Sequence, residues 1–354
     1  MIKHLQLALT NYCNLDCIMC PHTLETGMRE KHEFLPLGVL QKILECDVGF
    51  QTIYSFYLGE PLAHPDFYRI MELLFSRNLE QRFFQNIEFY TNGTYLNPDL
   101  TSRLFSLLNC HREQGRIGRI YFSLDAVTEE TYHCIRRNGE LKKVEENVLN
   151  FLSQRKKSGL DYPKVSLCFL VMPENHEETR KFAVTWQSRL AEFGDAGLIS
   201  TLNNEEFSAL GKMGDNVFIR PLRSYKGDQE EMDRLFLSVS AELGISAIST
   251  REERELDNSV GMRSGGRNNP CAHPFTSPLI DADGTLLPCC QDNRRELSLG
   301  SLHHENFREI WWGEKAYRLR KAHLNRDLSE FECCRNCSAS TPLKDDDWNE
   351  QDLE

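Results

Sequence analysis

The chain has 354 residues, a formal net charge of −12 and thirteen cysteines. This length predicts about two domains, and the negative charge opposes binding to a phosphate backbone. The first residues lack an export signal and no run of 18 apolar residues occurs, so we expect a cytoplasmic chain without a nucleic-acid or membrane partner, whose reduced thiols bind metal.

Between residues 1 and 225, short β-rich segments alternate with amphipathic segments. This order is typical of parallel strands joined by crossover helices, and it predicts a partial barrel of the α/β class. The expected strands cover residues 3–9, 52–58, 87–90, 117–124, 165–171 and 216–220, and the expected helices cover 37–46, 65–77, 99–108, 129–136, 141–157 and 176–193.

Three cysteines, Cys13, Cys17 and Cys20, lie within eight residues after the first predicted strand. A CxxxCxxC loop can hold three corners of a cubane 4Fe-4S cluster and leaves one iron open for another ligand. A zinc site is the alternative, but structural zinc prefers four protein ligands, usually arranged in CxxC pairs. We therefore expect an iron-sulfur cluster with one open iron.

At these residues the chain resembles the radical SAM superfamily. The resemblance implies a partial (β/α)6 TIM-like barrel at residues 1–225 and a 4Fe-4S cluster whose open iron binds S-adenosylmethionine (SAM). It also implies reductive cleavage of SAM to a 5′-deoxyadenosyl radical, with the electron supplied by a donor such as flavodoxin or ferredoxin. In such enzymes the cofactor carries the chemistry, and the protein supplies binding and orientation.

Several later motifs resemble SAM-contact positions of the same superfamily. Gly59-Glu60-Pro61 resembles its GGEP motif, with Leu58 in place of the first glycine, and others follow successive strands. Ordinary turns, a solvated helix face and core packing are the alternatives. The residues that the resemblance implies in cofactor binding are Met19, Gly59, Glu60, Pro61, Asn92, Ser123, Asp125 and Arg136. Alternation along the strand predicts that Ser123 and Asp125 face the same side.

Residues 226–269 have a different pattern, which predicts an amphipathic helix at 229–243 followed by a polar linker at 251–269. Residues 270–340 contain a second group of cysteines, and residues 341–354 form an acidic tail. Asp283-Gly284 lies between two apolar runs and predicts a hairpin turn, and a helix is expected over 302–323.

The second cysteine group resembles the SPASM domain in its shortened, twitch-like form, a small cysteine-rich α+β domain. The resemblance implies one auxiliary 4Fe-4S cluster held by Cys271, Cys289, Cys334 and Cys337, and the neighbouring Cys290 or Cys333 could replace a ligand. A zinc ribbon is the alternative because CxxC pairs bind either metal.

The expected function is that of a radical SAM oxidoreductase of the dehydrogenase or epimerase type. The favoured substrate is a small molecule with an alcohol group, such as a sugar, an aminocyclitol or a nucleoside, because little chain precedes Cys13 to recognise a peptide. Cys168 is a candidate hydrogen donor for epimerisation, although a buried cysteine is more often part of the core. A maturase acting on a ribosomally made peptide and a non-enzymatic zinc-binding adaptor are the alternatives.

Overall fold

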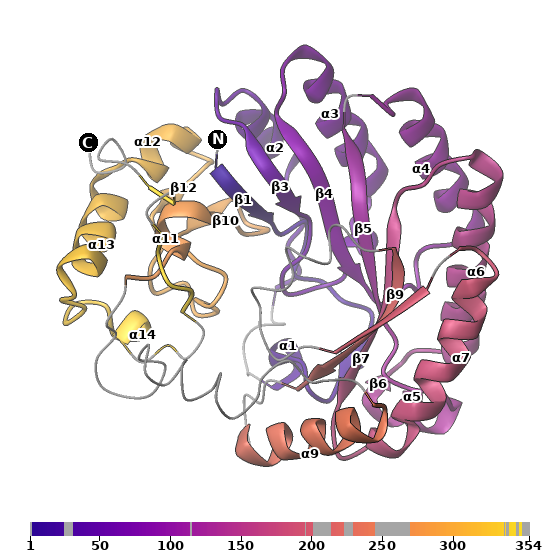
Figure 1. The fold of residues 1–354 in the computed structure, drawn as a ribbon. Helices are drawn as coiled ribbons and strands as arrows, with labels where there is room; N and C mark the ends of the chain where they lie inside the picture. Colours follow the sequence, from indigo (N-terminus) through magenta and orange to yellow (C-terminus); the bar gives the residue numbers. More distant parts are fainter. Residues whose placement is uncertain are drawn as a thin grey trace.

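The computed structural model describes residues 2–24, 31–113, 115–194, 196–200, 214–222, 229–244, 270–335, 337, 340–344 and 347–348. Its main feature is a ten-stranded sheet in the order β12-β11-β10-β1-β3-β4-β5-β7-β9-β8 (Figure 1). The strands of the barrel part, all parallel to one another, are β1 (Ile2–Leu7), β3 (Phe50–Tyr54), β4 (Phe84–Thr91), β5 (Arg116–Ser123), β7 (Lys164–Val171), β8 (Ala196–Ser200) and β9 (Asp215–Pro221).

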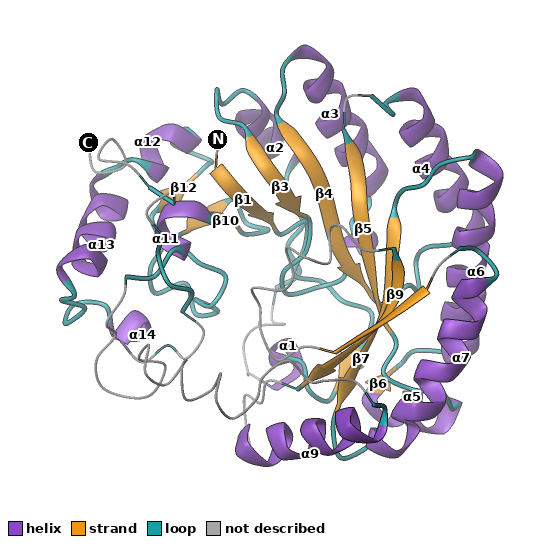
Figure 2. Cartoon of the chain, viewed as in Figure 1, coloured by secondary structure: helices purple, strands orange, loops and turns teal. Residues whose placement is uncertain are grey.

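Helices connect these strands and cover one face of the sheet (Figure 2). They are α2 (Leu37–Leu44), α3 (Phe67–Glu80), α4 (Pro98–Cys110), α5 (Glu129–Ile135), α6 (Leu141–Ser158) and α7 (Thr179–Ala191), with short 3-10 turns at η1 (Pro61–Ala63) and η2 (His176–Glu178). Local sequence sets several of their ends. Asn97 caps α4 by accepting from the backbone N–H of Leu100, and Gly159 ends α6 at a φ of +68°, a conformation that glycine adopts without strain.

The two faces of the sheet differ in chemistry because side chains alternate along each strand. The helix-covered face is apolar and includes Ile87, Phe89, Ile120, Phe122 and Leu167 in the main core. The opposite face forms a separate small cluster of Tyr121, Cys168 and Phe218, with Tyr90 packed against it. This second face is the inner face of the partial barrel.

The carboxyl-terminal part contains β10 (Leu279–Ile280), β11 (Thr285–Leu287) and β12 (Gly300–Ser301), with α11 (His273–Thr276), α12 (Phe307–Trp311), α13 (Glu314–Asn325) and α14 (Glu332–Arg335). Strand β10 pairs with β1 in parallel, and β11 and β12 continue the same sheet as antiparallel strands. This part of the chain therefore satisfies the backbone groups along the free edge of β1, which an open barrel would otherwise expose.

The predicted fold class is confirmed, an α/β barrel followed by a small cysteine-rich domain. The hairpin predicted at Asp283-Gly284 is present, with Gly284 at a φ of +81°, and the predicted helix at 229–243 is α9 (Gln229–Glu242). The single helix expected over 302–323 is wrong. It is two helices divided at Gly313, where an added Cβ would lie 2.4 Å from the carbonyl oxygen of Glu309.

Three strands of the structure were not predicted from the sequence, and some predicted segments lie outside the described residues. Strand β8 was not predicted, and neither was the small antiparallel pair formed by β2 (Asp16–Cys17) and β6 (Arg136–Arg137). The predicted linker at 251–269 and most of the acidic tail lie outside the described residues. Within the described part of the chain, no helix combines the length and the apolar character needed to span a membrane.

Candidate functional site

The first cysteine loop follows β1 and is attached to the segment after α5. In the β2–β6 pair, Cys17 lies opposite Arg136, and the N–H of Ile18 donates to the carbonyl oxygen of Ile135 at 3.0 Å. The N–H of Cys20 donates to the carbonyl oxygen of Cys17 at 3.2 Å, which turns the chain back. The loop is therefore held at both its centre and its end, and α1 (Pro21–Leu24) follows it.

The three thiols of this loop lie close enough to affect one another electrostatically. Burial raises the pKa of Cys13 to about 12, with further contributions from Glu60 and from Cys17 and Cys20. Burial also raises the pKa values of Cys17 and Cys20. Coordination to iron supplies the positive charge that stabilises such thiolates, so this donor set fits an iron-sulfur cluster. No three metal-binding side chains among the described residues already surround a point suited to a single ion.

Gly59 and Glu60 join the cysteine loop to the second strand. Gly59 has a φ of +130° and lies against the backbone of Thr10 and Asn11, so only glycine fits at this position. The N–H of Glu60 donates to the carbonyl oxygen of Tyr12 at 2.8 Å. Pro61 follows as the buried first residue of η1. The hydrogen bond between Glu60 and Tyr12 holds the Gly59-Glu60-Pro61 segment next to Cys13.

The buried carboxylate of Glu60 links three segments. It accepts hydrogen bonds from the Thr91 hydroxyl (2.7 Å), the N–H of Asn92 (2.7 Å) and the N–H of Leu62 (3.1 Å). Burial raises the pKa of Glu60 to about 7, although these hydrogen bonds act in the opposite direction. The carboxylate thus orients the end of β4, where the next site residue lies.

Asn92 directs its side-chain amide toward the cysteine loop. Its Nδ2 donates to Cys13 Sγ at 3.8 Å and to Asn14 Oδ1 at 3.0 Å, while its Oδ1 accepts from the N–H and the hydroxyl of Thr94. The sequence analysis implied that Asn92 takes part in cofactor binding. The structure brings it next to the predicted cluster ligand.

Asp125 and Arg136 form a buried ion pair close to the same loop. Arg136 Nη2 pairs with Asp125 Oδ2, and Arg136 Nη1 donates to Cys17 Sγ at 3.6 Å. Two expectations need correction. Arg136 lies in β6 after the end of α5, and Asp125 lies beyond the end of β5 with a φ of +60°, so it does not continue the strand alternation of Ser123. The loop after the strand turns its carboxylate toward Arg136.

The remaining predicted contacts are Ser123 and Met19. Ser123 is the last residue of β5, lies opposite Cys168 of β7 and is half-buried. Met19 is half-buried between two cysteines of the loop. Ser123 therefore lies at the carboxyl end of a strand, where barrel enzymes carry their chemistry, and Met19 lies within the first cysteine loop.

Polar and aromatic residues line the inner face beside this site. The rings of Tyr90 and Tyr121 stack with centroids 4.2 Å apart, the Tyr121 hydroxyl donates to Glu88 Oε2 at 3.0 Å, and Arg220 Nη1 donates to the Tyr90 hydroxyl at 3.3 Å. The sequence analysis missed Glu88, Tyr90 and Tyr121 as site residues. Their signal was the recurrence of polar or hydroxyl-bearing residues at alternate positions of strands that are otherwise apolar.

Cys168 lies within this inner-face layer and is only 3% exposed. It packs with Tyr121 and Phe218. Burial raises the pKa of Cys168 to about 12, so the thiol keeps its proton at neutral pH.

The second cysteine group lies in the carboxyl-terminal part. The pKa of Cys289 is raised, first by a hydrogen bond with Cys290 and by burial, and further by the charge of Cys271. That of Cys334 is raised in the same way by Cys333, burial, Cys271 and Cys337. The four cysteines expected to hold the auxiliary cluster therefore influence one another. None of the thirteen cysteines, all of which lie in the described part of the chain, forms a disulfide.

The two alternative ligands hydrogen-bond to Cys289 and Cys334 and have further neighbours. Cys290 and Tyr57 both pack against Ala8, Leu279 and Leu287, while Cys333 is affected first by Cys334 and also by the charges of Asp292 and Glu296. Tyr57 follows β3, and its hydroxyl donates to Asn293 Oδ1 at 2.8 Å. Cys290 thus lies where the barrel and the carboxyl-terminal part meet.

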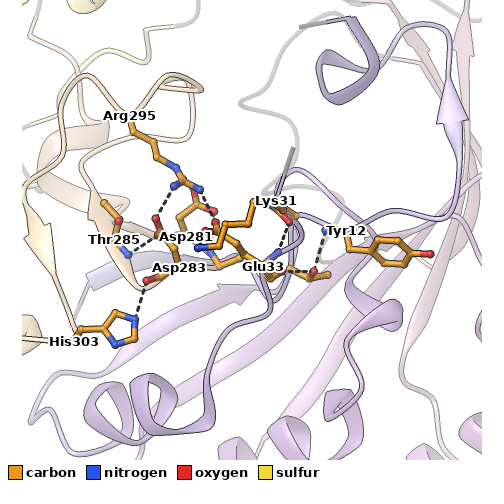
Figure 3. A network of polar contacts seen from close by, with 11 residues as sticks. Tyr12, Lys31, Glu33, Asp281, Asp283, Thr285, Arg295 and His303 are labelled. Carbon is orange, nitrogen blue, oxygen red and sulfur yellow. Dashed lines mark hydrogen bonds and ion pairs between the residues drawn. The ribbon is translucent and has the colours of Figure 1, made fainter. Parts of the chain in front are cut away.

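A network around Arg295 connects the hairpin of the carboxyl-terminal part to Glu33 of the barrel part (Figure 3). Arg295 donates to Asp281 (2.8 Å), to Asp283 (2.5 Å) and, from Nη2, to Glu33 at 3.4 Å. The backbone of Glu33 bonds in turn to Asn11, two residues before Cys13. The hairpin of the carboxyl-terminal part is thereby attached to the chain that leads into the first cysteine loop.

Known proteins resemble this chain over most of its length. A probable GTP 3′,8-cyclase from Methanothermobacter marburgensis is 25% identical over 316 residues, which cover 87% of this chain and 92% of the relative. A tungsten-containing aldehyde ferredoxin oxidoreductase cofactor-modifying protein from Pyrococcus furiosus is 26% identical, over 57% of this chain and 52% of the relative.

Solved structures share the fold at lower sequence identity. The structure of anSMEcpe with bound AdoMet has a TM-score of 0.54 and 18% identity, covering 96% of this chain and 86% of that one. That of BtrN in complex with AdoMet and 2-DOIA has a TM-score of 0.50 and 13% identity, covering 98% and 97%.

Two family profiles together account for most of the chain. Residues 7–184 match the radical SAM superfamily, and residues 271–338 match the SPASM iron-sulfur cluster-binding domain. The first domain type binds a 4Fe-4S cluster and SAM, and the second binds auxiliary iron-sulfur clusters. The cysteine loop at the carboxyl edge of the sheet is in the first matched region, and the second cysteine group is in the other. The chain belongs to the radical SAM superfamily and carries a SPASM domain.

Proposed function

We propose that this radical SAM enzyme oxidises an alcohol group of a small molecule. When bound, the 4Fe-4S cluster and SAM supply a 5′-deoxyadenosyl radical that removes a hydrogen atom from carbon. The observation that carries the SAM-dependent part of the proposal is the convergence of three segments on the first cysteine loop. The Glu60 carboxylate orients Asn92, and both Asn92 and Arg136 donate to cysteine sulfurs.

In this proposal Cys13, Cys17 and Cys20 hold the cluster that binds SAM. The backbone of Gly59, Glu60 and Pro61 faces the amino group of SAM, Ser123 contacts its methionine or ribose part, and Met19 packs near the adenine. Asp125 acts through Arg136, because both of its carboxylate oxygens are already engaged by Arg136 and by the N–H of Leu170.

The auxiliary cluster is assigned to Cys271, Cys289, Cys334 and Cys337. The effects of Cys271 on Cys289, and of Cys271 and Cys337 on Cys334, support this set. Cys290 and Cys333, which hydrogen-bond to Cys289 and Cys334, are the alternative ligands. The assigned boundaries are residues 1–225 for the barrel, 226–269 for the helix and linker, and 270–340 for the auxiliary domain.

Oxidation is favoured over epimerisation by the surroundings of two cysteines. The charges of Cys289 and Cys290 both act on Tyr57, which follows β3, so an auxiliary cluster held at Cys289 would be near the carboxyl ends of the strands and could accept an electron from a substrate there. Cys168, the candidate hydrogen donor for epimerisation, is buried in the aromatic layer. A flavodoxin- or ferredoxin-type protein is the proposed electron donor.

A small-molecule substrate is supported by the relatives. Several are named GTP 3′,8-cyclase, and BtrN is recorded with 2-DOIA. The second candidate substrate is a peptide, because a structural neighbour is recorded with AdoMet and a peptide. The superfamily assignment favours either enzyme over the zinc-binding adaptor.

The test begins with anaerobic reconstitution of the full chain. We expect about eight irons per chain if both sites hold cubanes, and 5′-deoxyadenosine formation when SAM and a reductant are added. Cys17→Ala should abolish SAM cleavage, and Cys271→Ala should spare it but reduce product. Cys110→Ala, which changes an exposed cysteine, is the matched control. Zinc in place of iron, without SAM cleavage, would refute the proposal.

The substrate class is tested with deuterated nucleoside triphosphates, deuterated aminocyclitols and deuterated peptides. Deuterium that arrives in 5′-deoxyadenosine identifies the compound and the carbon attacked. Transfer from peptides alone would refute the small-molecule proposal, and solvent deuterium in the product would indicate epimerisation.

A further inference from the structure

Arg136 is only 6% exposed, and its side chain lies between an acid and a cysteine sulfur. Its Nη2 pairs with Asp125 Oδ2, and its Nη1 donates to Cys17 Sγ at 3.6 Å. The β2–β6 pairing places the backbone of Arg136 directly opposite that of Cys17. The contact between guanidinium and sulfur therefore follows from the register of two paired segments.

Asp125 holds the guanidinium in this direction. Its Oδ1 accepts from the N–H of Leu170 at 2.7 Å, and its carbonyl oxygen accepts from Asn175 Nδ2 at 2.8 Å. Its carboxylate is fully buried. Because Asp125 is attached to β7 and to the loop after it, the carboxylate cannot turn away without breaking these hydrogen bonds.

We propose that Arg136, oriented by Asp125, raises the reduction potential of the cluster held at the first cysteine loop. Arg136 is then a positioning residue that acts through Cys17, and the inference rests on the function proposed above. Reduction adds negative charge to the cluster and its thiolates, so a cation near a ligand sulfur stabilises the reduced form. Low water access makes the effect larger than at an exposed site.

Two features of the surroundings support this role. The guanidinium stays charged at every pH at which the protein is folded, so the effect on the cluster is constant. Asn92 and the backbone of Leu15 donate neutral N–H groups to Cys13 Sγ, and the backbone of His22 and Thr23 donates to Cys20. Among the described residues, the charged donor to a sulfur of this loop is Arg136, at Cys17.

The role predicts shifts of opposite sign for the two members of the ion pair. Arg136→Gln removes the cation and should lower the potential. Asp125→Asn removes the anion that partly neutralises Arg136, while an oxygen remains to accept from Leu170, and should raise the potential. A purely structural pair would not produce opposite shifts.

The experiment is a potentiometric titration of the reconstituted full chain, followed by electron paramagnetic resonance. The cluster of interest is identified by the change of its signal when SAM is added. We expect Arg136→Gln to lower the equilibrium constant for reduction of this cluster at least tenfold. For a one-electron couple this is a reduction potential lower by 59 mV. Arg137→Gln is the matched control, since Arg137 is the exposed neighbour in the same strand, and should leave the potential unchanged.

Three results would overturn the inference: equal potentials for Arg136→Gln and Arg137→Gln, a downward shift in Asp125→Asn, or loss of iron in both Arg136→Gln and Asp125→Asn. The last would make the pair structural. Absence of any SAM-responsive signal in the unmodified chain would instead refute the proposed function, so the two failures are distinguishable.

Discussion

Gly59→Ala is expected to destabilise the barrel next to the first cysteine loop. Gly59 has a φ of +130°, and an added Cβ would lie 2.3 Å from the carbonyl oxygen of Thr10 and 3.0 Å from the Cα of Asn11. The strained backbone costs about 1–3 kcal/mol, and displacing packed backbone costs about 1–3 kcal/mol more. The sum is about 2–6 kcal/mol, a large share of the 5–15 kcal/mol typical of a folded chain.

Two other glycines separate these contributions. Gly159 has a φ of +68° but nothing within 4 Å of an added Cβ, and Gly38, in helix α2, has open space and no positive φ. Gly159→Ala should cost about 1–2 kcal/mol from the left-handed backbone alone, and Gly38→Ala should be neutral or stabilise by up to about 1 kcal/mol. Free energies from urea unfolding, followed by circular dichroism, compare the three variants. The reasoning is refuted if Gly59→Ala costs no more than Gly159→Ala.

Three further substitutions test other contacts. Glu60→Gln should lose about 1–3 kcal/mol of unfolding free energy, because an amide nitrogen would replace one of the oxygens that accept from Leu62, Thr91 and Asn92. An unchanged free energy of unfolding in urea would contradict this. Arg295→Met should lose about 1–2 kcal/mol in thermal unfolding, because it leaves the buried carboxylate of Asp281 without its cation, and Arg295→Lys should recover only part since lysine lacks the planar fork. Cys168→Ala should spare both SAM cleavage and product, measured by chromatography; loss of product alone would favour epimerisation over oxidation.

The pattern of strands and helices was predictable because burial of one sheet face imposes a local periodicity on the chain. The β-rich segments at 117–124 and 165–171 indicated β5 and β7 to within one residue at each end. The prediction of one helix over 302–323 was wrong because the apolar spacing continues across Gly313. The close approach of Gly313 to the carbonyl oxygen of Glu309, where the two helices separate, exists only in the folded chain.

Some of the predicted site residues lie together because they are close in sequence, and others only because the chain folds. Cys13, Cys17 and Cys20 are close in sequence, so their spacing alone predicted a common site. Arg136 lies more than a hundred residues later, and its contact with Cys17 depends on the β2–β6 register. Short two-residue strands carry no periodicity that a sequence can reveal.

The amino-acid sequence by itself determined the superfamily, the two cysteine groups and the order of parallel strands, because these depend on residue types at short spacing. Only the tertiary structure decided that β10 extends the barrel sheet at β1, that Arg295 connects the hairpin to Glu33, and that Asp125 turns Arg136 toward a cysteine sulfur. Each of these contacts joins segments far apart in the chain, and their geometry is set by strand register and by the packing of buried charges, which local sequence does not encode.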